Sequence, residues 1–402
     1  MKTKENNISG ATRERLWNPN YLKVWSANFM LFLSFMLLTP LLPLYLNEQF
    51  GADKETIGFV LAGYTLTTLL VRPFSGYIVD SFPRKMVLMI TFGVFAAFFG
   101  GYLLAGSLVM FAIVRTLHGF PFGAVTVANS TVAIDVLPSS RRTEGIGFYG
   151  LSNNIATAIG PTIALWIFAW CENFNVLFAL SLIIAFGGFF IDSSVRLKNR
   201  DLKVSRPPIS FDRFILTKGW SQSLCMICFA FSFGVLSTYI AIYARDELGV
   251  TGGTGFFFML LAGGLILSRL TGSRSLRKGK IAQNAAVGIA VSLCGYFLFA
   301  AVHNIYAFYA SALIIGLGNG HMFPAFQNMF INLANNDRRG TANSTLLVSW
   351  DVGVGSGTLI GGSIAEYQGF EGAFWAAFAV NAAGAALFYI HSRAHYLRNR
   401  LR

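Results

Sequence analysis

The sequence predicts an all-α polytopic membrane protein in which twelve transmembrane helices form two six-helix, pseudo-symmetric bundles. Three observations lead to this prediction. Of the 402 residues, 54% are hydrophobic and only 12% are charged, about half the charged share of an ordinary soluble domain. Twelve mostly apolar stretches are long enough to cross a bilayer, which takes about 20 residues. One long polar segment, residues 193–218, divides these stretches into two sets of six.

The predicted spans set the domain organisation. We expect the first six at 23–46, 57–79, 86–104, 107–134, 145–169 and 174–192, and the last six at 219–243, 255–271, 282–302, 305–330, 341–364 and 372–391. The polar segment between them carries a run of basic residues and the pair Pro207-Pro208, which is typical of a tether. The expected order is an N-terminal tail (1–22), an N-terminal bundle (23–192), a linker (193–218), a C-terminal bundle (219–391) and a C-terminal tail (392–402).

The distribution of basic residues predicts the orientation. Of the 31 Lys and Arg residues, 26 fall on the segments that share a side with the N-terminus, two fall on the opposite side, and three (Arg72, Arg115 and Arg269) lie within spans. The positive-inside rule therefore predicts that both termini are cytoplasmic. The same rule explains the net charge of +13 without a nucleic-acid partner. Residues 1–22 are polar and contain no cleavable signal peptide, and we expect a multi-pass protein of a bacterial inner membrane.

Several chemistries are absent from the sequence. Cys225 and Cys228 form a Cys-x-x-Cys, but they lie in an apolar helix, so we interpret them as buried hydrophobic residues and predict no metal or redox site. No GxxxxGK[ST] motif occurs, so the chain encodes no ATP hydrolysis. A membrane-embedded enzyme would need clustered groups such as GxSxG or HExxH, and the five histidines are scattered. We therefore predict a protein that is not an enzyme and has no cofactor.

The two halves repeat one another in two places. Spans 2 and 8 each carry an arginine, Arg72 and Arg269, shortly before a glycine and a basic cluster. Spans 5 and 11 each follow an Arg-Arg pair, at 141–142 and at 338–339. Corresponding positions of this kind are typical of a duplicated half.

Three motifs then resemble those of the major facilitator superfamily, and the resemblance covers nearly the whole chain. The loop after span 2 matches Gly-x-x-x-Asp-x-x-Gly-(Arg/Lys)-(Arg/Lys), with Pro83 in place of the second glycine. Span 4 matches Arg-x-x-x-Gly at Arg115 and Gly119. Span 5 contains the Gly-Pro associated with antiporters at Gly160-Pro161, although Ala156 and Ala164 replace two glycines. The chain is similar to the branch of twelve-span drug:proton antiporters and sugar-efflux proteins.

The resemblance implies a cytoplasmic gate that joins the two halves. Its residues here are Gly76, Asp80, Arg84 and Lys85. Gly76 is expected to let span 2 approach span 11, where a repeat of small residues, Gly353, Gly357 and Gly361, is expected to supply the facing surface. Gly160 and Pro161 are expected to serve helix packing. The alternative for Arg84 and Lys85 is that they only obey the positive-inside rule.

Ionisable residues within spans are candidates for proton coupling, because a charge in the bilayer is costly. They are Asp351, Arg115, His118 and His321, with Asp135 and Glu144 as further candidates near the inner surface. Asp351 is the single acid near a span centre. For Arg115 and His118 the alternative is a structural role within the bundle. For Asp351 it is an ion pair with an arginine such as Arg269.

Buried amides and an aromatic residue are candidates for the lining of a substrate cavity. Amides hydrogen-bond polar solutes and aromatic rings provide stacking surfaces. The alternative for each amide is a hydrogen bond between helices. The candidates are Asn28, Asn153, Asn154, Asn319, Gln327, Asn328 and Trp350.

The leading hypothesis is a secondary active transporter that works by alternating access. It would export a small organic compound across the inner membrane, driven by the proton-motive force and without a cofactor. The alternative is a proton-coupled symporter that imports a sugar, a peptide or another small solute. The resemblance implies a monomer whose partners are the substrate, protons and the lipid bilayer.

Overall fold

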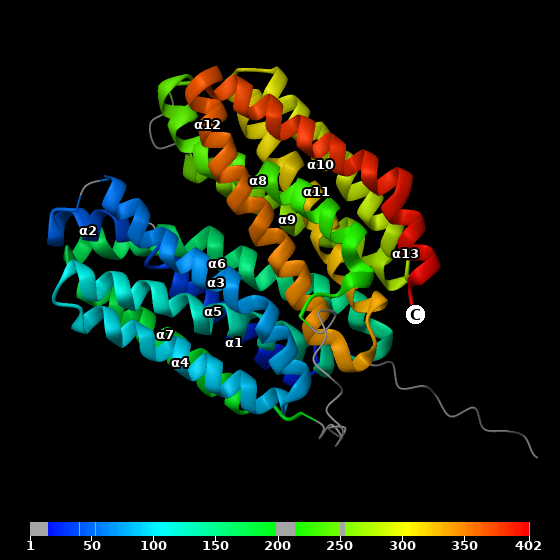
Figure 1. Cartoon of the computed structure of the whole chain (residues 1–402), viewed down its shortest axis with the longest axis horizontal. Helices are drawn as coiled ribbons and strands as arrows, with labels where there is room; N and C mark the ends of the chain where they lie inside the picture. Colours follow the sequence, from blue (N-terminus) through cyan, green and yellow to red (C-terminus); the bar gives the residue numbers. More distant parts are fainter. Residues whose placement is uncertain (1–14, 40, 53, 198–213, 250–253, 402) are drawn as a thin grey trace, which may run out of the picture.

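A computed structural model describes residues 15–39, 41–52, 54–197, 214–249 and 254–401, and this part of the chain is helical and contains no β-strand (Figure 1). The Pro207-Pro208 tether expected in the linker lies outside the described residues.

The helices of the N-terminal half follow the first six predicted spans. They are α1 (Pro19–Met36), α2 (Leu42–Phe50), α3 (Lys54–Ser81), α4 (Arg84–Leu104), α5 (Leu108–Val136), α6 (Arg142–Cys171) and α7 (Phe174–Ser193).

The helices of the C-terminal half follow the last six spans. They are α8 (Trp220–Asp246), α9 (Thr254–Arg277), α10 (Ile281–Ala301), α11 (Ile305–Leu333), α12 (Arg339–Leu387) and α13 (Arg393–Asn399).

The helices depart in two places from the expected pattern of one helix for each span. The first span is broken into α1 and α2, with a turn between them and Pro43 in the first turn of α2. Conversely, α12 contains both of the last two spans, and its backbone reverses at Gly369, where φ is 76°. A positive φ of this kind suits glycine because it has no Cβ.

The duplication is visible in the local structure. Helices α5 and α11 are both 29 residues long, and each is followed by a three-residue 3₁₀ turn, Ser139–Arg141 and Asn336–Arg338. Each of these helices also begins with a side-chain cap, since Ser107 accepts from the backbone N–H of Met110 and Asn304 accepts from that of Ala307. Such caps satisfy N–H groups that the first turn leaves unpaired.

Seven segments of the described helices are long and apolar enough to cross a membrane by length and composition alone. They are 84–104, 108–136, 174–193, 217–240, 255–272, 281–301 and 367–399. Other helices at predicted spans carry polar residues that they bury inside the protein, as α3 does with Thr67, Thr68, Arg72 and Ser75. These polar residues lower the hydropathy of a span without exposing charge to lipid.

The helices form two bundles, α1–α7 and α8–α13, which come together where α12 begins and diverge toward α2 and the reversal in α12 (Figure 1). Among the described helices, α8 and α12 make the most extensive contact, and both spans of α12 take part in it. The glycine repeat allows the first of these spans to approach α8 closely. A Cβ on Gly353, Gly357 or Gly361 would lie within 2.8 Å of α8, and Gly357 is the tightest, 2.1 Å from the carbonyl oxygen of Phe231.

The glycine repeat therefore faces α8, and the expectation that it faces span 2 is wrong. Helix geometry gives the reason, because successive residues turn by about 100°. Residues 340, 341 and 344 lie on the side of α12 that meets α3, as described below, whereas the repeat lies on another side.

The glycine packing predicts unequal effects of two neighbouring substitutions. We expect Gly357→Ala to destabilise the protein by about 1–3 kcal/mol, since the new methyl group would overlap backbone atoms of α8. Gly355→Ala is the matched control, because a Cβ there has nothing within 4 Å, and removing a helical glycine gains about 0.5–1 kcal/mol. Thermal unfolding of the purified protein in detergent measures both. Equal unfolding temperatures for the two variants would contradict the close approach of α8 and α12.

Candidate functional site

The two bundles are joined at one end of the molecule, which we call the latch end and define by Asp80, Arg84, Asp135 and Arg339. Asp80, in the last turn of α3, accepts from the backbone N–H groups of Gly340 (2.9 Å) and Thr341 (2.8 Å) and from the Thr341 hydroxyl (3.0 Å). These donors form the first turn of α12. A carboxylate at a helix N-terminus is stabilised by its unpaired N–H groups and by the helix dipole.

Arginines from both bundles meet at a second carboxylate of the latch end. Asp135, at the end of α5, pairs with Arg84 of the same bundle and with Arg339 of the other bundle (2.8 Å). Arg84 also pairs with Asp80 at 3.1 Å. The latch end is thus a connected network of two acids and two arginines that spans the bundles.

The remaining gate residues lie beside this network. A Cβ on Gly76 would be 2.7 Å from the Ser344 Cβ and 3.0 Å from the Gly340 carbonyl oxygen, so glycine is what allows α3 to approach α12. Lys85 faces α7 instead, and its ammonium donates to the carbonyl oxygens of Asp192, Ser193 (2.9 Å) and Val195 (3.0 Å).

A second layer of contacts lies behind the charges. Ser344 donates to the carbonyl oxygen of Arg72, and Asn343 donates to the hydroxyl of Thr131 (3.2 Å). Asn328 donates to the carbonyl oxygen of Thr143 (3.3 Å), and Gln327 donates to Asn343 (3.2 Å). All these donors belong to the C-terminal bundle.

The positions of Gln327 and Asn328 favour the alternative of a hydrogen bond between helices over the lining of a cavity. Both lie in the last two turns of α11, at the latch end. Asn328 donates a hydrogen bond to the N-terminal bundle. Gln327 donates to Asn343, and Asn343 in turn donates to Thr131 of the N-terminal bundle. Their amides serve the closure of this end in the present conformation.

The innermost contact between the bundles is an ion pair in the spans. Arg72 of α3 lies 3.0 Å from Asp351 of α12, and the side chains are 7% and 18% exposed. The partner of Asp351 is thus Arg72, and the alternative that named Arg269 is wrong. Along the helix axes, Arg72 lies about 12 Å from Asp80 and Asp351 lies about 18 Å from Arg339 of the latch end. The hydrogen bonds and ion pairs between the bundles that are described above all lie at this pair or closer to the latch end.

Arg115 and His118 lie inside the N-terminal bundle. Tyr102 connects them, since its hydroxyl is 2.8 Å from Nδ1 of His118 and accepts from Arg115 at 3.4 Å. The Arg115 guanidinium lies over the ring of Tyr64, 4.1 Å from its centroid. His118 is fully buried, and the rings around it are those of Tyr64, Phe95, Phe98, Phe99 and Tyr102.

A second polar cluster of this bundle joins α1 to α6. Asn28 donates to Ser152 (2.8 Å) and to the amide oxygen of Asn153 (2.7 Å), and it accepts from the Tyr149 hydroxyl (2.7 Å). Asn154, the next candidate, is partly exposed. The hydrogen bonds of Asn28 and Asn153 hold the two helices together.

The C-terminal bundle holds the remaining candidates. His321 is bonded through Nε2 to Thr271 (2.9 Å) and through Nδ1 to Asn284 (3.0 Å). Asn319 accepts from Ser292 (3.2 Å). Trp350, beside Asp351, packs against the rings of Phe233 and Phe323 at 5.4 and 5.3 Å.

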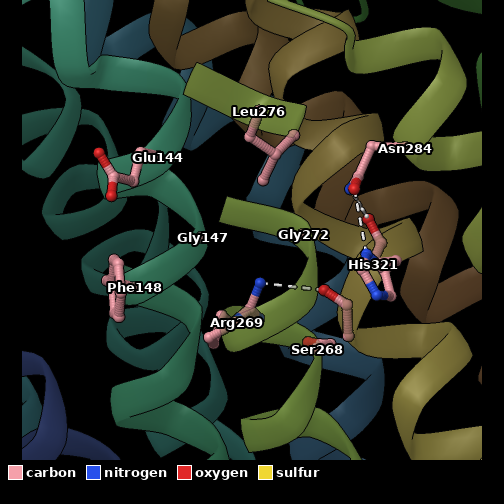
Figure 2. Close-up of a pocket in the computed structure, with 10 residues that line it drawn as sticks. Glu144, Gly147, Phe148, Ser268, Arg269, Gly272, Leu276, Asn284 and His321 are labelled. Atoms are coloured by element: carbon pink, nitrogen blue, oxygen red, sulfur yellow. Dashed lines mark hydrogen bonds between the residues drawn. The ribbon is translucent and has the colours of Figure 1, made fainter. Parts of the chain in front are cut away.

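A small cavity of about 10 Å³ lies where α6 meets α9 and α11. Figure 2 shows Glu144, Gly147 and Phe148 on one side of it and His321 on the other, with Arg269 between them. Arg269 donates to the carbonyl oxygen of Gly320 at 2.9 Å, and Glu144 pairs with Arg141 at 2.8 Å. The cavity has room for about one water molecule.

Gly160 of α6 packs closely against α1. A Cβ at Gly160 would lie 2.6 Å from the Cβ of Met36, in the last turn of α1. Pro161 follows within α6, and the structure does not describe its side chain.

Sequence reasoning missed how the acids and arginines are paired. It listed Asp135 only as a further candidate for proton coupling and treated Arg72 and Arg339 only as echoes between the halves. A usable signal was present, because an arginine within a span requires a partner and Asp351 is the one acid near a span centre.

Comparisons with known proteins agree with this architecture. The family model of the Major Facilitator Superfamily matches residues 24–295 and 284–401. The staphylopine export protein of Staphylococcus aureus (strain Mu50 / ATCC 700699) is 24% identical over 365 residues, 87% of this chain and 90% of that protein. The quinolone resistance protein NorA of Staphylococcus aureus (strain COL) is 21% identical over 380 residues, 91% of this chain and 94% of that protein.

Solved structures share the fold. The human organic anion transporter MFSD10 (TETRAN) superposes with a TM-score of 0.78 at 14% identity, covering 92% of this chain and 99% of the other. The transporter FucP in the outward conformation gives a TM-score of 0.77 at 13% identity, covering 94% and 99%. The predicted fold of twelve helices in two bundles is confirmed. The family match covers nearly all of the chain, so this protein belongs to the Major Facilitator Superfamily and is a transporter, not an enzyme.

Proposed function

We propose that the protein exports a small organic compound across a bacterial inner membrane in exchange for protons, by alternating access. The observation that carries the proposal is the ion pair between Arg72 and Asp351, which joins α3 to α12 within the spans. The pair is a charge contact between the moving halves, and one of its members can be neutralised by a proton.

An unpaired charge within the bilayer is costly. An ionised Asp351 and Arg72 offset one another, and the attraction between them helps to hold the bundles together. Protonation of Asp351 removes that attraction and leaves Arg72 charged and unpaired. The proton therefore favours separation of α3 from α12, which is the movement that opens the latch end.

This coupling fits exchange if the latch end is cytoplasmic, as the basic residues predict. The present conformation would then be closed to the cytoplasm. A proton from outside would neutralise Asp351, the latch end would open, and the proton would leave to the cytoplasm. Substrate would then bind from the cytoplasm and be carried outward as the latch end closes again. The proton-motive force drives such a cycle with a monomer and no cofactor.

The names of two relatives support export. One is called an export protein and the other a resistance protein, and both match about nine-tenths of this chain. The resemblance of the span 5 Gly-Pro motif to that of antiporters agrees with them.

Energised inside-out vesicles test the proposal, with a dye that reports their acidic interior. Lipophilic cations, neutral sugars, peptides and organic acids are added in turn. We expect one class to release protons in wild-type vesicles and not in vesicles that contain Asp351→Asn. The control is Asp337→Asn, an acid on the 3₁₀ turn before α12 that takes no part in the ion pair.

Two results would overturn the proposal. If no class discharges the gradient while solute uptake into right-side-out vesicles depends on it, the protein is a symporter. If Asp351→Asn releases protons as the wild type does, Asp351 is a packing residue.

A further inference from the structure

Arg115 is a buried charge without a carboxylate partner. It lies within a membrane span and is 4% exposed, and among the described residues no acid lies within ion-pair distance of it. The groups that contact its guanidinium are uncharged: the Tyr102 hydroxyl at 3.4 Å, the Tyr64 ring at 4.1 Å and the Phe35 ring at 5.4 Å. Aromatic faces stabilise a guanidinium, but they do not neutralise it.

Two donors at this place are unused. The Tyr64 hydroxyl and Nε of Arg115 are both buried and have no hydrogen-bond partner in the described part of the chain. Tyr64 itself is 5% exposed. Buried polar atoms are almost always bonded, and one that is not calls for an explanation such as a missing ligand. A ligand that satisfies an arginine N–H and a tyrosine O–H must offer acceptors, and an anion does this best.

The unused donors lie on α3 and α5, farther from the latch end than the ion pair. Tyr64 is eight residues before Arg72 on α3, about 12 Å along the helix axis. Arg115 lies seven residues into α5, about 10 Å from the end of that helix opposite the latch end. Phe35, which covers the guanidinium, is partly exposed and lies in the last turn of α1, just before the break in the first span.

The surrounding side chains are aromatic. The Phe35 ring lies 5.1 Å from that of Tyr64 and 5.0 Å from that of Phe122, and Phe122 contacts Phe32 at 5.8 Å. Such a wall suits an apolar or aromatic body attached to the charged group.

The charge balance excludes a cation at this place. Asp351 is the single acid near a span centre, and Arg72 neutralises it. Arg115 therefore leaves an uncompensated positive charge within the N-terminal bundle. A positive site with donors attracts anions and repels cations.

We propose that Tyr64 and Arg115 bind the carboxylate of the substrate, an organic anion with an apolar or aromatic body. The inference rests on the proposed transport function, but it does not depend on the direction of transport or on proton coupling.

Binding to the purified full-length protein in detergent, without any gradient, tests the inference. The probes are 2-naphthoate and 2-naphthamide, which share a ring system and differ in charge. We expect naphthoate to bind at least tenfold more tightly than naphthamide. Arg115→Gln should lose that preference, Arg115→Lys should keep part of it, and Tyr64→Phe should weaken naphthoate several-fold. Arg196→Gln, which removes a cation exposed at the end of α7, is the control and should bind as the wild type does.

Equal binding of the two probes, no binding of naphthoate, or wild-type binding by Arg115→Gln would overturn the inference. If Arg115→Gln does not elute as a folded monodisperse protein, Tyr64→Phe decides, since it removes a single oxygen. Failure of the proposed function looks different. In that case naphthoate binds to the wild type through Arg115, while no compound moves protons in the vesicle assay.

Discussion

Replacing Asp351 with asparagine should abolish uphill transport and preserve exchange. The asparagine cannot carry a proton, so we expect gradient-driven transport into inside-out vesicles to fall at least tenfold. Exchange of labelled for unlabelled substrate across the same membrane requires only that the bundles rock with substrate bound, and we expect it to remain within a few-fold of the wild type. Transport and counterflow in the same vesicle preparation measure both.

The variant also leaves Arg72 buried without its partner, which costs about 3–5 kcal/mol when a buried pair is broken. Two further variants separate this loss of stability from the loss of coupling. Asp351→Glu keeps a titratable group and should keep part of the uphill transport. The double variant Arg72→Gln with Asp351→Asn is neutral, so it should recover stability but not coupling. Recovery of uphill transport in the double variant would show that Asp351 serves packing alone.

Replacing Asp80 with asparagine should shift the protein away from the present conformation. Asp80 accepts three hydrogen bonds from the first turn of α12 and pairs with Arg84, and a hydrogen bond to a charged group contributes about 1.5–3 kcal/mol. Loss of one such bond changes the ratio of two conformations by about 10- to 150-fold. The three hydrogen-bond donors to Asp80 belong to the other bundle, so the state in which the latch end is open should gain population.

Spin labels can follow this shift. Leu104→Cys and Tyr306→Cys place labels on exposed residues of the two bundles, at the ends opposite the latch end, after the four native cysteines have been replaced. We expect Asp80→Asn to add a population with a shorter distance between the labels. Asp337→Asn removes an acid from the same end of the molecule and should leave the distances unchanged. A distance distribution identical to that of the wild type in Asp80→Asn would mean that the network does not hold the latch end closed.

The sequence predicts the helices and their grouping well, because apolar length and charge placement follow from the bilayer itself. It also predicts that Gly76 lies next to span 11 and that Asp80 helps to join the two halves, because both expectations come from a motif at the end of span 2. The sequence does not predict how each helix is rotated about its own axis, so it does not predict which neighbouring helix a given face contacts. The periodicity of Gly353, Gly357 and Gly361 indicates a packing face, but it does not say that α8 is the neighbour.

The same limit applies to the site residues. Arg72 and Asp351 are more than 270 positions apart, and only the packing of α3 against α12 brings them together. Gln327 and Asn328 are amides in an apolar helix, a pattern that fits a cavity and a closed interface equally well. Their place in the last turns of α11 assigns them to the interface. The unused donors of Tyr64 and Arg115 cannot be seen in a sequence at all, since they depend on which partners are missing.

The proton current of reconstituted liposomes tests the central claim most directly. The claim is that Asp351 carries a proton in the direction opposite to the substrate. Liposomes that contain the protein are prepared in weak buffer without a gradient, and the substrate identified in the vesicle assay is added outside while the external pH is recorded. For the wild type, we expect acidification of the medium as substrate enters the liposomes. For Asp351→Asn, we expect no change in pH, although counterflow persists. Alkalinisation of the medium, or acidification that survives in Asp351→Asn, would contradict it.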